Sequence, residues 1–146
     1  MPALDRTECR RRVAAARHAH LATADADGVP HVVPVTFAAL DADDGTHLVS
    51  AVDHKPKTTT DLRRLRNLVD NPRASLLVDA YDEDWSRLWW VRADGPATIE
   101  TDGTARETAL DALAARYAPY RRRRPAGPLV RVRVARWTGW TAVQPD

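Results

Sequence analysis

Two acidic turns that end in glycine divide the first part of the chain into short segments. The first turn, DADG, is residues 25–28, and the second, DADDGT, is residues 41–46. Aspartate and glycine are residues that tight turns prefer, whereas the segments between the turns are rich in apolar and β-branched residues, which is typical of strands. These segments are HAHLATA (18–24), VPHVVPVTFAAL (29–40) and HLVSAV (47–52). We therefore expect a meander of three antiparallel strands. Two prolines confine the second strand to an edge, or to a place where its N–H groups are not all paired.

Three further stretches carry apolar residues at helical spacing. They cover residues 5–17, about 58–69, where DNPR ends the pattern, and 102–118. The expected N-caps are Asp5 or Thr7, then Thr58, Thr59 or Thr60, and finally Thr101 or Asp102. The side chains expected to face the core are Leu4, Cys9, Val13 and Ala16 in the first helix, Leu62, Leu65, Leu68 and Val69 in the second, and Leu110, Leu113 and Tyr117 in the third.

Three more strands complete the expected set: ASLLVDAY (74–81), RLWWVRADGPATIE (87–100), bent near Gly95-Pro96, and LVRVRVARWTGWTAV (129–143). The last strand alternates, with Val130, Val132 and Val134 facing inward and arginines facing outward. Residues 118–128 are expected to form a loop. Six strands, mostly in meander order, with three helices favour an α+β fold built on a small antiparallel β-barrel. The length of 146 residues fits one domain over 1–146.

The composition is that of an ordinary globular chain with few large core residues. Five Trp, three Tyr and one Phe make a thin core, which favours burial against a second subunit. A net charge of +2 does not indicate a nucleic-acid-binding protein. No apolar run approaches the length of about 18 residues that a membrane span needs, and the N-terminus lacks the pattern of a signal peptide, so we expect a cytoplasmic protein. The one cysteine, Cys9, lies on an apolar helical face and is expected to be a packed thiol.

The sequence lacks the common motifs of catalysis and nucleotide binding. It contains no G-x-G-x-x-G, no P-loop and no G-x-S-x-G. Most carboxylates lie in turns, where aspartate serves the turn geometry. His18 and His20 are two residues apart on a predicted strand and share a face, but the sequence places no third ligand near them, so we expect no metal site. The arginine run 121–124 is interpreted as a solvated loop, with binding of an acidic ligand tail as the alternative.

The only two lysines of the chain, Lys55 and Lys57, stand one residue apart, directly before three threonines and a predicted helix. The N-terminus of a helix offers free N–H groups and a partial positive charge, and threonine adds hydroxyl donors. Lysine is a point cation that can approach a phosphate from several directions. The segment therefore fits a phosphate site, and it fits a solvated, basic helix start equally well.

Four blocks of the sequence, in this order, resemble the split β-barrel flavin and deazaflavin oxidoreductases, the superfamily of pyridoxamine 5'-phosphate oxidase. The blocks are HLATADADGVPHVVPVTF, LVSAVDHKPKTT, NPRASLLVDAY and LWWVRADGPATI. The pattern KPKTTTDLRRLRNL joined to NPRASLLVD is most similar to the branch that uses coenzyme F420, an 8-hydroxy-5-deazaflavin. The resemblance implies a six-stranded antiparallel split β-barrel with flanking helices, like that of FMN-binding proteins.

The resemblance also implies where a cofactor would bind. The residues implied to hold the cofactor phosphate are Ser50, Lys55, Lys57 and Thr58. Those implied to lie along the ring are Val33, Pro34, Val35 and Thr36. Similar proteins are homodimers with cofactor sites at the interface, and the residues of the second subunit implied to close the site are Trp85, Trp89 and Trp90. Trp89 and Trp90 are neighbours on a strand, so they must point to opposite sides.

These implications predict an F420-dependent oxidoreductase that transfers a hydride between the deazaflavin and an unidentified small organic substrate. The near alternative is an FMN-dependent oxidase or reductase of the same fold. A non-catalytic flavin or haem binder is the second alternative, and His18 and His20 are the feature that favours haem. The ending RWTGWTAVQPD lacks the arginine-rich ending with which pyridoxamine phosphate oxidases hold substrate, which argues against vitamin B6 oxidation.

No catalytic side chain is assigned from the sequence. The proton that accompanies the hydride could come from solvent, from His31 or from Tyr81. The polyglutamate tail of F420 would need further cations, for which the candidates are Arg63, Arg64, Arg66, Arg73 and the run 121–124.

Overall fold

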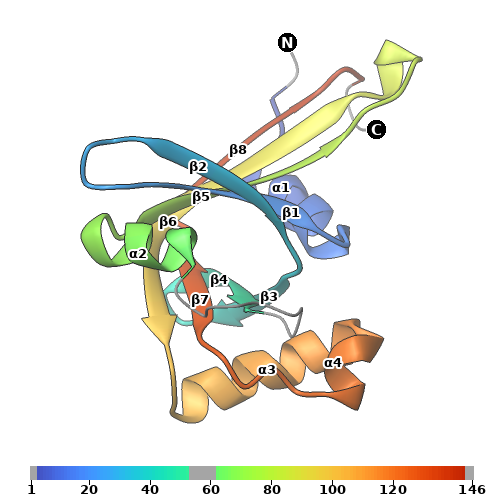
Figure 1. Cartoon of the computed structure of the whole chain (residues 1–146). Helices are drawn as coiled ribbons and strands as arrows, with labels where there is room; N and C mark the ends of the chain where they lie inside the picture. The colour runs from blue at the N-terminus through green and yellow to red at the C-terminus, as the bar shows by residue number, and fades with distance from the viewer. Residues whose placement is uncertain (1–2, 53–61, 144–146) are drawn as a thin grey trace.

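The computed structural model of the protein describes residues 3–52 and 62–143. Its helices are α1 (Arg6–Ala15), α2 (Arg63–Asp70), α3 (Thr104–Arg116) and α4 (Ala118–Arg122), with a 3-10 turn η1 (Trp85–Arg87). Its strands are β1 (Ala19–Ala24), β2 (Pro30–Val35), β3 (Ala38–Ala42), β4 (Gly45–Ala51), β5 (Arg73–Ala80), β6 (Trp89–Glu100), β7 (Leu129–Arg133) and β8 (Arg136–Thr141). Figure 1 shows β2, β1, β5 and β8 in an upper layer, β7, β4 and β3 below, and α3 and α4 at the bottom.

The long strand β6 joins the two layers because it pairs with strands of both. Its first part pairs with β5 and β8, and its last part, Ala97–Glu100, pairs with β7. The sheet runs in the order β2-β1-β5-β6-β7-β4-β3, with β8 also on β6, and its pairings are antiparallel. This is the expected α+β split β-barrel with flanking helices, but it has eight strands where six were predicted.

The two additional strands arise where a predicted strand turns a corner between the layers. The predicted strand 29–40 divides at Thr36 and Phe37 into β2 and β3, and the predicted strand 129–143 divides at Val134 and Ala135 into β7 and β8. At the second corner the N–H of Val134 still bonds to Thr46, whereas the N–H of Ala135 bonds to Asp94 of β6. The alternation of buried valines ends at Val134, because the next position of the same parity is the exposed Arg136, so the change of pattern coincides with the corner.

Gly95 lies where β6 passes from the upper layer to the lower one, the curved yellow strand of Figure 1. A Cβ atom at this position would lie 1.9 Å from the carbonyl oxygen of Arg133 and 3.1 Å from the nitrogen of Ala135. Both atoms belong to the backbone of the β7–β8 corner, which cannot rotate away as a side chain can. The absence of a side chain at Gly95 therefore allows the two parts of the sheet to meet.

The interior contains two clusters of buried apolar side chains. The larger one lies between the layers and includes Leu21, Phe37, Leu48 and Val132. The smaller one forms where α3 covers the lower layer, and it joins Leu110, Leu113 and Tyr117 of the α3 region with Val49 and Leu129. The inward side chains predicted for the third helix are thus confirmed.

Helix α1 packs on β8 through small side chains. Cys9 is fully buried, as expected of a packed thiol, and burial raises the pKa of this thiol. A Cβ atom added at Gly139 of β8 would lie 2.7 Å from the Cys9 sulfur, which shows how closely the helix approaches the strand. The predicted N-cap is confirmed, because the Asp5 carboxylate accepts a hydrogen bond of 2.8 Å from the Glu8 N–H. No helix of the described residues is both long and apolar enough to cross a membrane.

Helix α2 begins later than predicted. Its first residue is Arg63 and Leu62 occupies the N-cap position, so the prediction of a threonine cap is wrong; Thr58–Thr60 lie outside the described residues. Leu65 and Leu68 are buried as predicted. Val69 is 74% exposed, because the inner face continues instead through Asn67, whose amide donates to the Thr23 hydroxyl at 3.0 Å. Side chains two positions apart on a helix point to opposite sides, so Val69 faces away from the core when Asn67 faces it.

The C-terminal helices also differ from the prediction. Helix α3 begins at Thr104, and Gly103, which has a φ of 99°, occupies the N-cap position. The prediction of Thr101 or Asp102 as the cap is therefore wrong. The predicted loop 118–128 contains α4, which has Pro119 in its first turn, a position that proline favours.

The contact at Gly95 predicts a large effect of one added methyl group. We expect Gly95→Ala to lower the free energy of unfolding by about 3 kcal/mol or more, because the Cβ atom would meet backbone atoms that must shift. The matched control is Gly127→Ala, where the new Cβ would make an ordinary contact of 3.6 Å with Val52, and a change below about 1 kcal/mol is expected. Urea denaturation followed by circular dichroism measures both values, and equal losses would contradict the steric argument.

Candidate functional site

The residues predicted to hold a cofactor phosphate begin at the end of β4. Ser50 lies in β4 opposite Val130 and is buried. The predicted residues Lys55, Lys57 and Thr58 lie outside the described residues. The N–H of Val52 donates to the carbonyl of Pro128 at 3.1 Å, so the chain enters the predicted phosphate segment beside the start of β7.

The strand predicted to lie along the cofactor ring is an edge strand. Within the described sheet β2 pairs only with β1, as its two prolines require. Val33 and Val35 pack against the core, whereas Pro34 is exposed on the outer face. The strand ends at Val35, and because Ala38 of β3 pairs with Val49 of β4, the corner after β2 lies next to Ser50. The structure thus brings together the described parts of the predicted ring and phosphate regions.

Side chains of the α3–α4 region hold the corner after β2. The Tyr117 hydroxyl accepts a hydrogen bond of 3.2 Å from the Phe37 N–H, and it donates toward the carbonyls of Phe37 and Arg17 at 2.9 and 2.8 Å. The Arg116 guanidinium donates to the carbonyls of Phe37 and Ala16. The Tyr120 hydroxyl lies 2.7 Å from that of Thr36. The end of α1, the corner after β2 and the end of α3 are therefore tied together.

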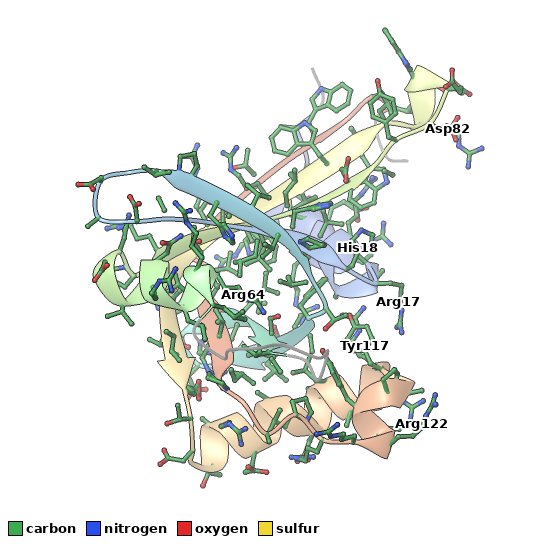
Figure 2. All side chains as sticks on the ribbon, in the orientation of Figure 1. Arg17, His18, Arg64, Asp82, Tyr117 and Arg122 are labelled. Carbon is green, nitrogen blue, oxygen red and sulfur yellow. The ribbon has the colours of Figure 1, made fainter. Side chains whose placement is uncertain are left out.

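The three tryptophans predicted to close a partner's site occupy different places. Trp85 lies in η1 at the tip of the β5–β6 hairpin and is 69% exposed; Figure 2 shows this tip, marked by Asp82, projecting from the body. Trp89 packs against the main core, with the guanidinium of Arg12 5.0 Å from its ring centre. Trp90 has Arg92 over its ring at 5.8 Å. Trp89 and Trp90 thus lie in different surroundings, as their adjacency requires.

A cavity of about 560 Å³ lies between the end of α1, the start of β1 and the edge of β5, and we call it the α1–β1 cavity. It exists because the ladder between β1 and β5 joins only His20–Ala22 to Ser75–Leu77, so the rest of β5 has no β1 neighbour. The residues that line it are Arg11, Arg12, Ala15, Ala16, Arg17, His18, His20, Leu77, Val78, Asp79 and Trp89. Figure 2 shows Arg17 and His18 at this end of the molecule, with Tyr117 below them.

The two histidines of the cavity pack against each other, with ring centres 5.6 Å apart in an edge-to-face arrangement. Among the described residues, no group of three or more His, Cys, Asp or Glu side chains is placed to hold a metal ion. The predicted proton donors lie elsewhere. His31 is on β2, and its Nδ1 is buried with no hydrogen-bond partner in the described structure, whereas Tyr81 is 76% exposed.

The positive charge of the arginines in the cavity is partly compensated by the carboxylate of Glu8 in α1. The Arg11 guanidinium and then that of Arg12 donate to this carboxylate and lower the pKa of Glu8 to about 2, so Glu8 is ionised at neutral pH. Arg17 donates instead to the backbone carbonyl of Arg116 at 2.8 Å. Asp79 is the acidic side chain in the lining. Three arginines against Glu8 and Asp79 leave one uncompensated positive charge.

The arginine run 121–124 is not simply a solvated loop. Arg121 donates to the carbonyls of Ala114 and Ala115 in α3, and Arg124 pairs with Glu107 and Asp111 at 3.0 and 2.9 Å. These side chains therefore brace α4 against α3. The contacts depend on α4, which the sequence pattern did not reveal.

Sequence reasoning missed the arginines of the α1–β1 cavity. They stand in the runs CRRR and ARHAH, which were interpreted as the polar face of a helix and the start of a strand. The available signal was the density of arginines and histidines between positions 10 and 20. Its meaning depends on Trp89 and Asp79, which only the folded chain brings close.

Comparisons with known proteins agree with this architecture. The family of pyridoxamine 5'-phosphate oxidase matches residues 6–141 of the chain. A search of curated proteins gave no match. An FAD-binding protein from Mesorhizobium loti is 24% identical, with a TM-score of 0.72 over 94% of this chain and 95% of that chain. A conserved hypothetical protein from Mycobacterium tuberculosis is 23% identical, with a TM-score of 0.71 over 95% and 86%. The haem storage protein HutZ from Vibrio cholerae is 17% identical, with a TM-score of 0.67 over 93% of each.

The two layers joined by β6 and the corners that divide β2 from β3 and β7 from β8 define a split β-barrel. The solved structures share this fold over nearly their whole length. The match over residues 6–141 covers most of the sequence, and the chain belongs to the pyridoxamine 5'-phosphate oxidase family.

The hydrogen bonds at the corner after β2 predict a specific loss of stability. Tyr117→Phe removes the hydroxyl that serves the N–H of Phe37 and leaves that buried group without its partner, so we expect the free energy of unfolding to fall by about 1–3 kcal/mol. Tyr81→Phe is the matched control, because this tyrosine is 76% exposed and no loss is expected. Denaturant unfolding of the two variants tests the difference, and an unchanged midpoint for Tyr117→Phe would show that the contacts contribute nothing.

Proposed function

We propose that the protein is an F420-dependent oxidoreductase. In this proposal the deazaflavin, when bound, exchanges a hydride with a small organic substrate, and the protein positions the cofactor and excludes water. The observation that carries the proposal is the family match over residues 6–141, together with the sequence of the segment between β4 and α2. That segment, with its two lysines, resembles the F420-using branch.

The described residues fit a phosphorylated, flat cofactor at the corner after β2. Ser50 and Thr36 place hydroxyl groups near this corner, and the edge strand β2 leaves Pro34 exposed beside it. The phosphate would be held by Ser50 with Lys55, Lys57 and Thr58, and the ring would lie along Val33–Thr36. The tie between Thr36 and Tyr120 would fix the end of the strand that the ring contacts.

We further propose that the active form is a homodimer with its cofactor sites at the interface. Large apolar side chains on and beyond the upper layer are exposed, among them Val32 at 60%, Leu77 at 37% and Trp85 at 69%. Burial of such side chains against a second copy would remove them from water. The tryptophan at the projecting hairpin tip and Trp89 would then close the site of the neighbouring subunit.

Two other functions are carried by specific features. An FMN-dependent oxidase or reductase would use the same phosphate segment, so the lysines do not separate the two cofactors. A haem binder is favoured by the α1–β1 cavity, where His18 and His20 stand beside apolar Leu77 and the guanidinium of Arg17, which could pair with a propionate. HutZ, which shares the fold, is a haem storage protein.

The test is a titration of F420, FMN and haemin against the purified protein, followed by absorption of the bound chromophore. We expect F420 to bind at roughly micromolar concentration and to lose about tenfold in affinity in Lys57→Ala and in Lys55→Ala, since each variant removes a cation from the phosphate. Arg6→Ala, which removes an exposed cation at the start of α1, is the control and should bind normally.

Each outcome separates the candidates. Preferred binding of FMN transfers the proposal to the flavin, and a Soret band that disappears in His18→Ala or His20→Ala favours haem. If neither F420 nor FMN binds, the oxidoreductase proposal fails. If F420 binds equally well to both lysine variants, the phosphate assignment is wrong even though the cofactor is right.

A further inference from the structure

The α1–β1 cavity combines features that the proposed cofactor site does not use. Its volume of about 560 Å³ falls within the range of small-molecule sites, which is roughly 300–1,000 Å³. Its lining belongs to α1, residues 16–18, β1, β5 and the start of β6. It includes none of the residues assigned above to the phosphate or the ring, and it shares only Trp89 with the residues proposed to close the site of the neighbouring subunit. The cavity therefore needs an explanation of its own.

One part of the lining is suited to an anion. Arg17 has its guanidinium 4.9 Å from the ring centre of Tyr117 and gives one N–H group to the carbonyl of Arg116, so its position is fixed while the fork retains further donors. Arg12 is similarly held, between Glu8 at 2.8 Å and the ring of Trp89, and only 15% of its side chain is exposed. Two arginines that are already ordered lose little freedom when they bind a carboxylate in the forked manner.

Another part of the lining is suited to a flat, apolar body. Trp89 and the edge-to-face pair of His18 and His20 supply aromatic surfaces, and Leu77 of β5 adds an exposed apolar side chain to the lining. Aromatic rings pack well on such surfaces. Asp79 is the acidic residue of the lining and would repel an anion placed against it, so the anionic end of a ligand must lie at the arginines.

We infer that the α1–β1 cavity binds a flat aromatic or conjugated carboxylate, with the carboxylate at Arg12 and Arg17 and the ring beside Trp89 and His20. The inference also deepens the proposed function, and this part of it rests on that proposal. Trp89 would reach the cofactor of the neighbouring subunit, so the cavity beside Trp89 would hold the acid group of the substrate. The substrate class is then an aromatic or conjugated carboxylic acid.

The experiment compares 2-naphthoate with its neutral analogue 2-naphthamide by isothermal calorimetry, on the protein without cofactor. We expect naphthoate to bind about tenfold more tightly than naphthamide, and Arg17→Gln and Arg12→Gln to remove that preference while naphthamide binding stays unchanged. Arg122→Gln, an exposed arginine on α4 that Figure 2 shows away from the cavity, should behave as wild type.

Two results would overturn the binding site. One is equal affinity of the wild type for naphthoate and naphthamide. The other is a naphthoate affinity that stays at the wild-type value in Arg17→Gln and in Arg12→Gln, as it should in the control Arg122→Gln. Because the wild-type comparison needs no variant, a failure of Arg17→Gln to fold would not remove the test.

A second arm identifies the source of the carboxylate. F420 and the same deazaflavin riboside without its phosphate and glutamyl tail are titrated against wild type and Arg17→Gln. The substrate assignment is supported if F420 binds wild type and Arg17→Gln with the same affinity, if the riboside does so too, and if naphthoate binds to the F420 complex. Loss of F420 affinity alone, with competition by naphthoate, assigns the cavity to the cofactor tail and overturns the substrate assignment. Binding of naphthoate to a protein that binds neither deazaflavin would retain the carboxylate site and refute the proposed cofactor.

Discussion

The two layers of the sheet depend on one strand, β6, and on the lack of a side chain where it crosses between them. At Gly95 the backbone of β6 runs so close to the β7–β8 corner that no Cβ atom fits. The same place carries the hydrogen bond from Ala135 to Asp94, which starts β8 on the upper layer. A single strand can therefore pair with β5 and β8 in one half and with β7 in the other. The corner after β2 connects the same two layers on the other side of the barrel.

That second corner is held by side chains, because no close backbone approach fixes it. Arg116 and Tyr117, at the end of α3, use the carbonyl and N–H groups of Phe37 and also reach the chain after α1. One set of contacts thus determines where β2 ends and where β1 can begin. Since β1 meets β5 only from His20 onward, space remains beside α1, and this space is the α1–β1 cavity. The contacts that close the barrel and the position of the candidate ligand site have the same origin.

Much of the fold could be predicted from local pattern. The alternation of Val130, Val132 and Val134, the Asp5 cap and the inward Leu110 and Leu113 are confirmed, because each depends on period or on a neighbour in sequence. The two corners were not predicted. At the corner after β2 the alternation of Val33, Val35 and Phe37 continues and hides the bend, whereas at the second corner the apolar positions change from Val134 to Trp137, a sign that was not used. Helix α2 was assigned too early because threonines are good caps in general. For the candidate site, Thr36 and Ser50 lie near one corner, and their part in binding a cofactor stays a prediction. The cavity arginines gain meaning only from residues some seventy positions away.

The use of arginine in the fold gives the two lysines a clearer meaning. In the described structure the planar guanidinium of Arg116 bridges two backbone oxygens, because its Nη1 donates to the carbonyl of Phe37 and its Nη2 to that of Ala16. A fixed fork suits such fixed pairs of acceptors. Lysine lacks this planar pair of donor nitrogens, but its ammonium group can turn toward an oxyanion from many directions. The chain braces its frame with arginine and places its two lysines between β4 and α2. In the proposed function, the task of these lysines is to hold the phosphate of the cofactor.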